Sequence, residues 1–203
     1  LFRSQLAGAK LIAAPGCYPT SVIVPVAPIA EAGLIEPGRR VIVDSTSGVS
    51  GAGRKANERT SFCEVSQSPY GVFSHRHQPE IDAYAGTPTL FTPHLGPYDR
   101  GICSTIHVDL AGDTSESDVR RVLEQAYAGE PFVRLLEPGV WPSVASVRQT
   151  NFVEIGFAVR DGHLIVVSCI DNLLKGASGQ AVQALNAAMG FGERLGLLPG
   201  AHA

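Results

Sequence analysis

The chain has 203 residues, a length that holds one large domain or one domain with part of another. Hydrophobic residues make up 44% of the chain and charged residues 17%, a composition that excludes a disordered protein. The formal net charge is −3 and neither sign forms a long run, which argues against a surface for nucleic acid or for an anionic membrane.

The sequence has no apolar stretch of the roughly 18–20 residues that cross a bilayer, and no secretion signal at its start. Its four cysteines, Cys17, Cys63, Cys103 and Cys169, lie far apart without a C-x-x-C pair, which fits neither a disulfide scaffold nor a structural zinc site. We therefore expect reduced thiols, a cytoplasmic location and no metal. Because the chain begins at Leu1 and leads at once into a candidate site, we also expect a further N-terminal piece.

The pattern of apolar residues predicts alternating strands and helices. A short apolar run at 11–14 ends at Pro15-Gly16, which would place Cys17 at a strand-to-helix turn. Strands are expected at 40–45, 64–67, 89–92, 102–111, 152–160 and 163–170, and helices at 20–32, 79–84, from Ser115 onward and at 176–195.

One hairpin and one helix cap carry the clearest local signals. Asp161-Gly162 between two apolar runs is a strong signal for an antiparallel hairpin, and Ser115 with Asp118 resembles a capping box. The order of elements predicts an α+β domain, with a mixed, largely antiparallel sheet and helices on one face.

Cys17 is the leading candidate for chemistry. The unpaired N–H groups and the positive dipole at a helix N-terminus stabilise a thiolate, so we expect a pKa below the ordinary value of about 8.5. The alternative is a small buried residue in a tight turn. The other three cysteines lie in strand-like runs and are assigned to the core.

The segment 74–80 holds two imidazoles, a guanidinium and a carboxylate. His75 and His77 would face the same way in an extended segment and offer an acid/base near pH 7, while Arg76 or Glu80 could hold substrate or orient a ring. The alternatives are a solvated polar loop and a metal site, for which no third ligand lies at a convincing spacing.

Three further segments are weaker candidates. The Gly-rich loop 48–54 could cradle an anion with its backbone amides, helped by Arg54, but it matches no nucleotide-binding fingerprint. His94 and Arg100 bracket a turn and could bind a carboxylate or phosphate, or be solvated. The small residues at 175–180 permit close approach by a ligand or by another segment of the protein.

Together these motifs resemble one enzyme family. Five motifs occur in the same order as in the N-acetyl-γ-glutamyl-phosphate reductases, which belong to the aspartate-semialdehyde and glyceraldehyde-3-phosphate dehydrogenase-like group. They are the segment 12–20 around Cys17, Ser-Gly-x-Ser-Gly-Ala-Gly-Arg at 47–54, His-Arg-His-x-Pro-Glu-Ile at 75–81, Thr-Pro-His-Leu at 92–95 with Arg100-Gly101, and Lys-Gly-Ala-x-Gly-Gln-Ala at 175–181. The resemblance spans residues 11–198.

The resemblance implies a two-domain enzyme, in which a Rossmann domain that binds NADP(H) precedes an α+β domain with the thiol and the dimer interface. On this basis we expect 1–16 to be the end of the Rossmann domain, 17–185 the catalytic and dimerisation domain, and 186–203 the end of the last helix and a tail. These residues alone would lack the phosphate and adenosine sites for NADPH and would be inactive as a reductase.

The resemblance also implies roles for individual residues. Cys17 would attack the acyl phosphate to give a thioester, which hydride would reduce to the semialdehyde of arginine biosynthesis, with His75 as acid/base and His77 and Glu80 as substrate or orienting groups. The remaining assignments are substrate binding by Ser50, Gly51, Arg54 and Arg100, and nicotinamide contacts by Gly176, Ala177 and Gly179.

Other functions stay open at this point. The substrate could be a glutamyl or aminoadipyl phosphate attached to a carrier protein, the thiol and imidazole could serve a hydrolase or acyltransferase, or the domain could only dimerise. The resemblance implies a homodimer or a homotetramer, and the sequence does not decide between them or between NADP and NAD.

Overall fold

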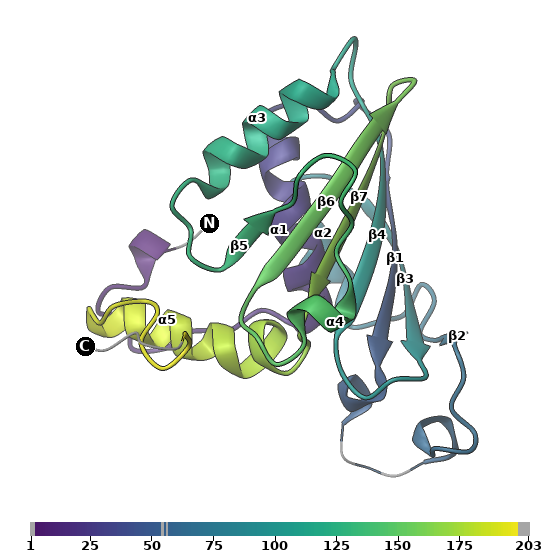
Figure 1. Ribbon diagram of the computed structural model, residues 1–203, viewed down its shortest axis with the longest axis vertical. Helices are drawn as coiled ribbons and strands as arrows, with labels where there is room; N and C mark the ends of the chain where they lie inside the picture. Colours follow the sequence, from purple (N-terminus) through teal and green to yellow (C-terminus); the bar gives the residue numbers. More distant parts are fainter. Residues whose placement is uncertain (1–2, 54, 56, 199–203) are drawn as a thin grey trace.

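The computed structural model describes residues 3–53, 55 and 57–198. Within them, seven strands form one sheet in the order β2-β3-β1-β4-β7-β6-β5 (Figure 1). The strands are β1 (Val41–Gly48), β2 (Ser68–Pro69), β3 (Thr89–Gly96), β4 (Ile102–Asp109), β5 (Val133–Leu135), β6 (Val153–Arg160) and β7 (His163–Ile170).

Five α-helices accompany the sheet in the described residues. They are α1 (Cys17–Glu31), α2 (Gln78–Tyr84), α3 (Glu116–Tyr127), α4 (Val144–Val147) and α5 (Gly179–Met189). None of the helices within these residues is both long and apolar enough to cross a membrane. Short 3-10 turns occur at Arg3–Gln5, Val49–Ala52 and Glu58–Thr60, and a π-helical turn occurs at Leu174–Ser178.

The strand pairing confirms the predicted mixed, largely antiparallel sheet. Only β1–β3 and β5–β6 are parallel, whereas β2–β3, β1–β4, β4–β7 and β6–β7 are antiparallel. The predicted hairpin is β6–β7, and both turn residues have positive φ, 51° for Asp161 and 74° for Gly162, as a two-residue type I′ turn requires.

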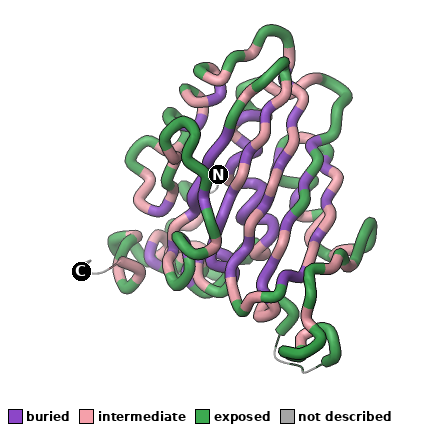
Figure 2. Tube along the Cα trace, turned by 45° about the vertical axis from the view of Figure 1, so that its right-hand side comes forward, coloured by how far each residue is buried: buried purple, intermediate pink, exposed green. Residues whose placement is uncertain are grey.

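Three helices, α1, α2 and α3, cover one face of the sheet, as predicted, whereas the short α4 lies on the opposite face, where Ser146 hydrogen-bonds Glu154. Along β4, Ile102, Ser104, Ile106 and Val108 are buried and alternate with half-buried residues, a pattern visible across the sheet in Figure 2. Ser21 of α1 hydrogen-bonds Ser104 at 2.7 Å, so the buried face is the one that α1 covers. Both α2 and α3 pack against α1 on this face.

The opposite face of the sheet is partly open. Ile42 of β1 is 44% exposed, and its cross-strand neighbour His107 is half-buried. At the β6 edge, residues 140–142 cover the face closely, because a Cβ at Gly156 would lie 2.7 Å from the carbonyl oxygen of Val140. The uncovered part lies over β1, β4 and β7.

The structure corrects the predictions around the first helix. Residues 11–16 form no strand, and α1 begins at Cys17 rather than at residue 20. The helix continues through Pro25 and Pro28, although a proline has no N–H to donate to the carbonyl four residues back. The hydroxyl of Tyr127 donates to the Val24 carbonyl, which Pro28 leaves free, and so replaces one missing bond.

Three other predictions need correction. The strand expected at 64–67 is absent from the described residues, and the short β2 follows it at Ser68–Pro69. The expected helix 176–195 is divided into the π turn Leu174–Ser178 and α5, which ends where Gly190 takes a left-handed C-cap at φ 73°. The short elements β5 and α4 had no signal in the sequence pattern.

Candidate active site

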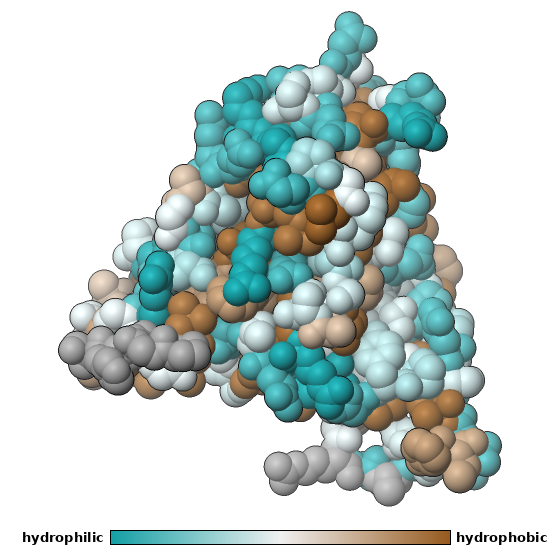
Figure 3. All heavy atoms as spheres, in the orientation of Figure 1, coloured by the Kyte–Doolittle hydropathy of each residue, from teal (hydrophilic) through white to brown (hydrophobic). Residues whose placement is uncertain are grey.

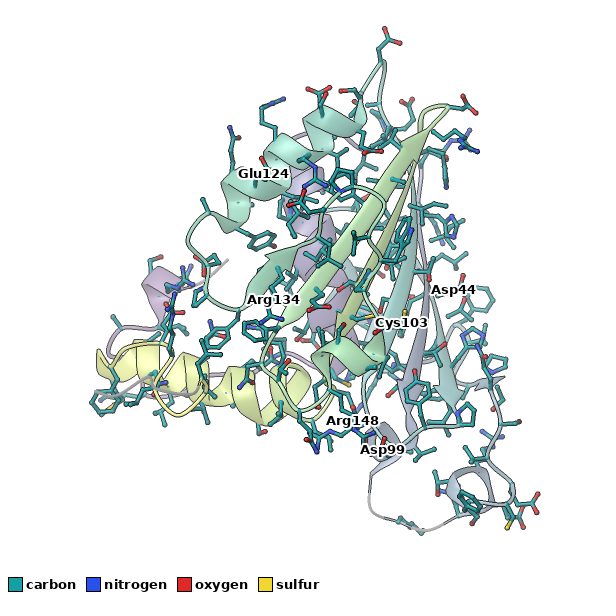
Figure 4. The ribbon with its side chains drawn as sticks, viewed as in Figure 1. Asp44, Asp99, Cys103, Glu124, Arg134 and Arg148 are labelled. Carbon is teal, nitrogen blue, oxygen red and sulfur yellow. The ribbon has the colours of Figure 1, made fainter. Side chains whose placement is uncertain are left out.

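The candidate residues meet at the end of the sheet where β1, β3 and β7 finish. Cys17 is the first residue of α1, which begins there, and the π turn follows directly on β7. Asp99 and Arg148 form an exposed ion pair at the same end, with Arg148 Nη2 2.5 Å from Asp99 Oδ2, and both are labelled in Figure 4.

Cys17 is a half-buried free thiol whose electrostatics differ from the expectation. Hydrogen bonds from the backbone N–H groups of Tyr18 and of Cys17 itself favour the thiolate, as expected at a helix N-terminus. Burial opposes them and is the largest influence, so the pKa of the Cys17 thiol is raised above its ordinary value. The predicted lowering of this pKa is therefore wrong for the resting site.

Two glycines let the chain close around Cys17. A Cβ at Gly176 in the π turn would lie 2.8 Å from Cys17 Cβ, and a Cβ at Gly16 would lie 2.5 Å from His77 Nε2. The N–H of Gly16 also donates to Glu80 Oε1 at 3.0 Å, which fixes the turn before the helix. Cys17, His77, Glu80 and Gly176 are thus brought together as predicted, across 160 residues of sequence.

His75 lies in a cage of aromatic rings. Its ring makes edge contacts with Tyr18, Tyr70, Phe91 and His77 at centroid distances between 4.9 and 5.5 Å. Burial, followed by the neighbouring His77 and Arg76, lowers the pKa of His75 to about 4. Its Nδ1 accepts the backbone N–H of His77 at 3.2 Å, so the neutral ring carries its proton on Nε2.

His77 is the imidazole that contacts the backbone next to Cys17. Burial, with a further contribution from Arg76, lowers its pKa, so this ring is also biased toward the neutral form. Its Nδ1 is buried without a hydrogen-bond partner among the described residues, while Nε2 lies against Gly16. The ring of His77 therefore packs with one nitrogen buried and the other against the residue that precedes Cys17.

The segment before His75 is exposed and apolar. Phe73 is 82% exposed and Phe62 95% exposed. Hydrophobic residues gather at the lower right of Figure 3, the end of the molecule that carries β2 and the Glu58–Thr60 turn. Phe73 also has a φ of 59°, a left-handed conformation that is costly for a bulky residue and is found most often at functional sites. This strained segment leads directly into His75.

Arg100 is engaged in a buried ion pair. Its Nε lies 2.8 Å from Asp171 Oδ2 and its Nη2 donates to Asp171 Oδ1 at 3.0 Å, and Asp171 is fully buried. Asp171 also accepts the backbone N–H groups of Gln149, Leu173 and Leu174 at 2.7–3.0 Å. Arg100 was predicted to bind substrate, but in this structure its Nε and Nη2 groups are directed at Asp171.

The Gly-rich loop is attached to the same turn through Asn172. The side chain of Asn172 donates to Ser50 Oγ at 3.1 Å and accepts the N–H of Gly101 at 2.6 Å. Gly51 is exposed, and a Cβ there would lie 2.6 Å from Ser47 Oγ. Ser50 and Gly51 therefore stand beside the Asp171–Asn172 turn, whereas Arg54 lies outside the described residues.

The three small residues of the π turn region have different surroundings. Gly176 contacts Cys17, Ala177 is exposed next to it, and Gly179 is buried. A Cβ at Gly179 would overlap Asn151 Oδ1, so the absence of a side chain serves packing there. Gly176 therefore packs directly against Cys17, and Ala177 is the exposed residue next to it in this turn.

Sequence reasoning missed four residues that shape this site. Tyr18 donates to the His94 carbonyl at 3.0 Å and accepts from Tyr70 at 3.1 Å, which builds the cage around His75. Asp171 and Asn172 organise the turn that carries Gly176. The sequence carries one signal for these two residues: they come between a buried strand and the Lys175-Gly176 motif. A carboxylate and an amide that are buried at such a place need hydrogen-bond partners.

The raised pKa of Cys17 predicts slow alkylation at neutral pH. Because burial disfavours the thiolate, the rate of iodoacetamide reaction at Cys17 should climb to a midpoint above that of a free cysteine in a peptide, about 8.5. The rate at Cys17 is measured by mass spectrometry of its peptide between pH 6 and 10, with Cys17→Ser as the blank. A midpoint below that of the peptide would contradict the dominance of burial.

Comparison with known sequences shows the family of the chain. The family model described as semialdehyde dehydrogenase, dimerisation domain, matches residues 17–172. Proteins named N-acetyl-gamma-glutamyl-phosphate reductase from Moritella profunda and Escherichia coli (strain K12) are each 49% identical, over 188 and 195 residues, which are 93% and 96% of this chain. These stretches cover 56% and 58% of the two relatives, so the chain spans little more than half their length.

The fold is shared with solved structures of low sequence identity. Aspartate semialdehyde dehydrogenase II from Vibrio cholerae superposes with a TM-score of 0.70 over 91% of this chain and 63% of that chain, at 20% identity. A probable aspartate-semialdehyde dehydrogenase from Pseudomonas aeruginosa gives the same TM-score at 16% identity over 91% of this chain and 64% of that one. With its family match over most of its length, this chain belongs to the semialdehyde dehydrogenase dimerisation-domain family.

Proposed function

We propose that this chain is the thiol-bearing part of a reductase that converts N-acetyl-γ-glutamyl phosphate to N-acetylglutamate 5-semialdehyde in arginine biosynthesis. The observation that carries the proposal is Cys17 at a helix N-terminus, enclosed by His77, Glu80 and Gly176. The names of the two relatives at 49% identity support the choice of substrate.

The first step is acyl transfer to Cys17. The sulfur attacks the acyl carbon, the bond between that carbon and the phosphate oxygen breaks, and the thiol proton leaves with the phosphate. Backbone N–H groups at the start of α1 stabilise negative charge on the sulfur and on the substrate oxygen. Because burial raises the pKa of the resting thiol, the thiolate forms most readily once a substrate is present to take its charge.

The second step is reduction of the thioester. NADPH, when bound, supplies the hydride, and Gly176 and Ala177 are our candidates for contacts with its nicotinamide end, because the turn that carries them packs directly against Cys17. The sequence holds no G-x-G-x-x-G phosphate loop, so these residues fit only that part of the cofactor. Gly179, predicted as a third contact, serves the packing of the same turn.

We assign the acid/base role to His75. With Nδ1 accepting the His77 N–H, the neutral ring carries its proton on Nε2. We assign this proton to the oxygen that becomes negative as hydride reaches the thioester carbon. When the carbonyl re-forms, the Cys17 thiolate leaves and the semialdehyde is released. His77 and Glu80 hold the substrate and the turn before Cys17 in place.

The substrate carboxylate, acetamide and phosphate need donors near the thiol. Ser50, Gly51 and Arg54 remain our candidates for these contacts, with Arg100 contributing through the loop that it anchors to Asp171. A carrier-linked glutamyl or aminoadipyl phosphate would undergo the same chemistry at Cys17. That alternative differs in what occupies the amine of the substrate, and the assay below separates the two substrates.

The acylation half-reaction tests the proposal directly. On mixing with N-acetyl-γ-glutamyl phosphate, the chain should release phosphate and gain one N-acetylglutamyl group, which hydroxylamine removes and which peptide mapping places on Cys17. Cys17→Ala should abolish the adduct, and Cys63→Ala, an exposed thiol outside the site, should leave it intact. An adduct that survives Cys17→Ala, or that forms only with a carrier-linked acyl phosphate, would refute the proposed substrate or nucleophile.

The two histidines should separate in steady-state kinetics. Turnover is measured as phosphate-dependent NADP reduction by the semialdehyde, in a fusion with the N-terminal part of the Escherichia coli relative that this chain does not match. His75→Asn should lower kcat by about 10²- to 10⁴-fold, while His77→Asn should act mainly on KM. Because the pKa of His75 is lowered to about 4, its ring is neutral above pH 5. Protonation of His75 should therefore not reduce kcat of the unsubstituted protein in that pH range.

The reverse distribution of effects would contradict these assignments. If His77→Asn lowered kcat by the larger factor and His75→Asn changed only KM, the acid/base role would pass to His77. An equal, modest loss in both variants would assign both rings to the structure of the site.

We propose that copies of the chain associate through the uncovered part of the sheet, as a homodimer or a homotetramer. The family to which the chain belongs is described as a dimerisation domain. Ile42 is exposed in the middle of a sheet, beside half-buried Leu90 and Ile165 on the same face. An apolar side chain that is exposed in the middle of a sheet is suited to burial against a second copy in a two-fold interface.

Placing a charge at the centre of this face should separate the copies. Ile42→Glu is expected to shift the sedimentation coefficient to that of a monomer. Leu185→Glu, on an α5 residue that is 53% exposed, is the matched control and should leave the oligomer intact. Dissociation by Leu185→Glu alone would move the interface to α5.

A further inference from the structure

Two cysteines outside the candidate active site lie directly opposite each other in the sheet. Cys103 of β4 and Cys169 of β7 are register partners in an antiparallel pair, and both thiols are free. Opposed residues in such a pair have Cα atoms about 4.5–5.5 Å apart. Disulfides form across Cα distances of about 4.4–6.8 Å, so the separation expected for this pair lies within the range of a disulfide.

The two thiols are unequal. They share a hydrogen bond, which lowers the pKa of Cys103 and raises that of Cys169, where burial acts in the same direction. Cys103 is half-buried and Cys169 fully buried. A more acidic, more accessible thiol beside a second, protonated thiol is the arrangement in which oxidation of the first is followed by attack of the second.

The thiol pair lies at the active-site end of the sheet, beyond the surface around Ile42. Tyr98 stands close to both sulfurs, which contribute to raising its pKa, and its hydroxyl donates to the Thr46 carbonyl at 2.9 Å. On the other side, Glu154 pairs with Cys169 in register and is held by Arg134 at 3.1 Å. Figure 4 labels Cys103 on β4 and Arg134 on β5, and β7 and β6 lie between these two strands in the sheet.

We propose that Cys103 and Cys169 form an oxidation site that a hydroperoxide converts to a disulfide across β4 and β7. The Cys103 sulfur attacks the peroxide oxygen, the O–O bond breaks, and Cys103 becomes a sulfenic acid while water or an alcohol leaves. The Cys169 sulfur then attacks the Cys103 sulfur, the S–O bond breaks, and the hydroxyl leaves as water with the Cys169 proton. Two thiols are oxidised to one disulfide and one peroxide is reduced.

The position of the disulfide connects it to the site. Cys103 follows Gly101 by two residues and Cys169 precedes Asp171 by two, and these strand ends are already joined by Arg100–Asp171 and Gly101–Asn172. A covalent bond at this place fastens the two strands at the base of the turn that carries Gly176. The oxidation site does not depend on the proposed substrate, because its chemistry involves neither Cys17 nor a nicotinamide.

A variant that keeps only the two thiols in question gives the test. In Cys17→Ser/Cys63→Ser, stoichiometric hydrogen peroxide should remove both titratable thiols, lower the intact mass by two hydrogens and yield a peptide pair linked through Cys103 and Cys169. Dithiothreitol should restore both thiols. The unsubstituted protein, treated in parallel, should give the same linked peptides.

The single-thiol controls show whether the order of attack is right. With Cys169→Ser added, Cys103 should gain one oxygen, trappable with dimedone, and with Cys103→Ser added, Cys169 should stay reduced. Circular dichroism confirms that each variant is folded. Persistence of both thiols under peroxide that oxidises a cysteine peptide, conversion of each to a sulfinic acid without a link, or links only between molecules would overturn the proposal.

Discussion

The buried carboxylate of Asp171 holds together the end of the sheet where the chemistry is placed. Its oxygens accept hydrogen bonds from the Arg100 side chain and from the backbone N–H groups of Gln149, Leu173 and Leu174. These donors lie in three separate segments of the chain. A fully buried carboxylate is tolerated only when its charge and lone pairs are satisfied, and loss of one partner of such a pair typically costs about 3–5 kcal/mol. The π turn and the Arg100 loop are therefore fixed by the same charge, and with them the position of Gly176.

Close backbone approach is the second constraint, and it explains why the site is built from turns. Gly176 and Gly16 lie against Cys17 and His77 at distances that a Cβ would forbid, so the thiol is enclosed by main chain rather than by side chains. Main-chain N–H groups at the start of α1 then act on the sulfur without competing side chains. The cost of this enclosure is desolvation, which raises the pKa of the thiol above its ordinary value.

Local signals allowed much of the fold to be predicted, and long-range partners account for the errors. Asp161-Gly162 and the Ser115 cap depend on neighbours within four residues, and both predictions are confirmed. The passage of α1 through Pro28 depends on Tyr127, about a hundred residues away, and the pairing of Arg100 depends on Asp171. Motifs brought Cys17, His75, His77 and Glu80 into one hypothesis, but no pattern in the sequence indicates which carboxylate a given arginine meets.

The two thiol environments show that neighbours, rather than position on an element, decide how a cysteine reacts. Cys17 has the helix N-terminus that predicts a thiolate, yet burial outweighs it. Cys103 is the second residue of β4, where no sequence rule predicts reactivity, yet one hydrogen bond from Cys169 favours its thiolate. A thiol that is protonated at rest is protected from adventitious oxidants, and a paired thiol nearby is the more easily oxidised of the two. On our proposal, the Cys103–Cys169 pair is therefore oxidised more readily than Cys17, although both lie at the same end of the sheet.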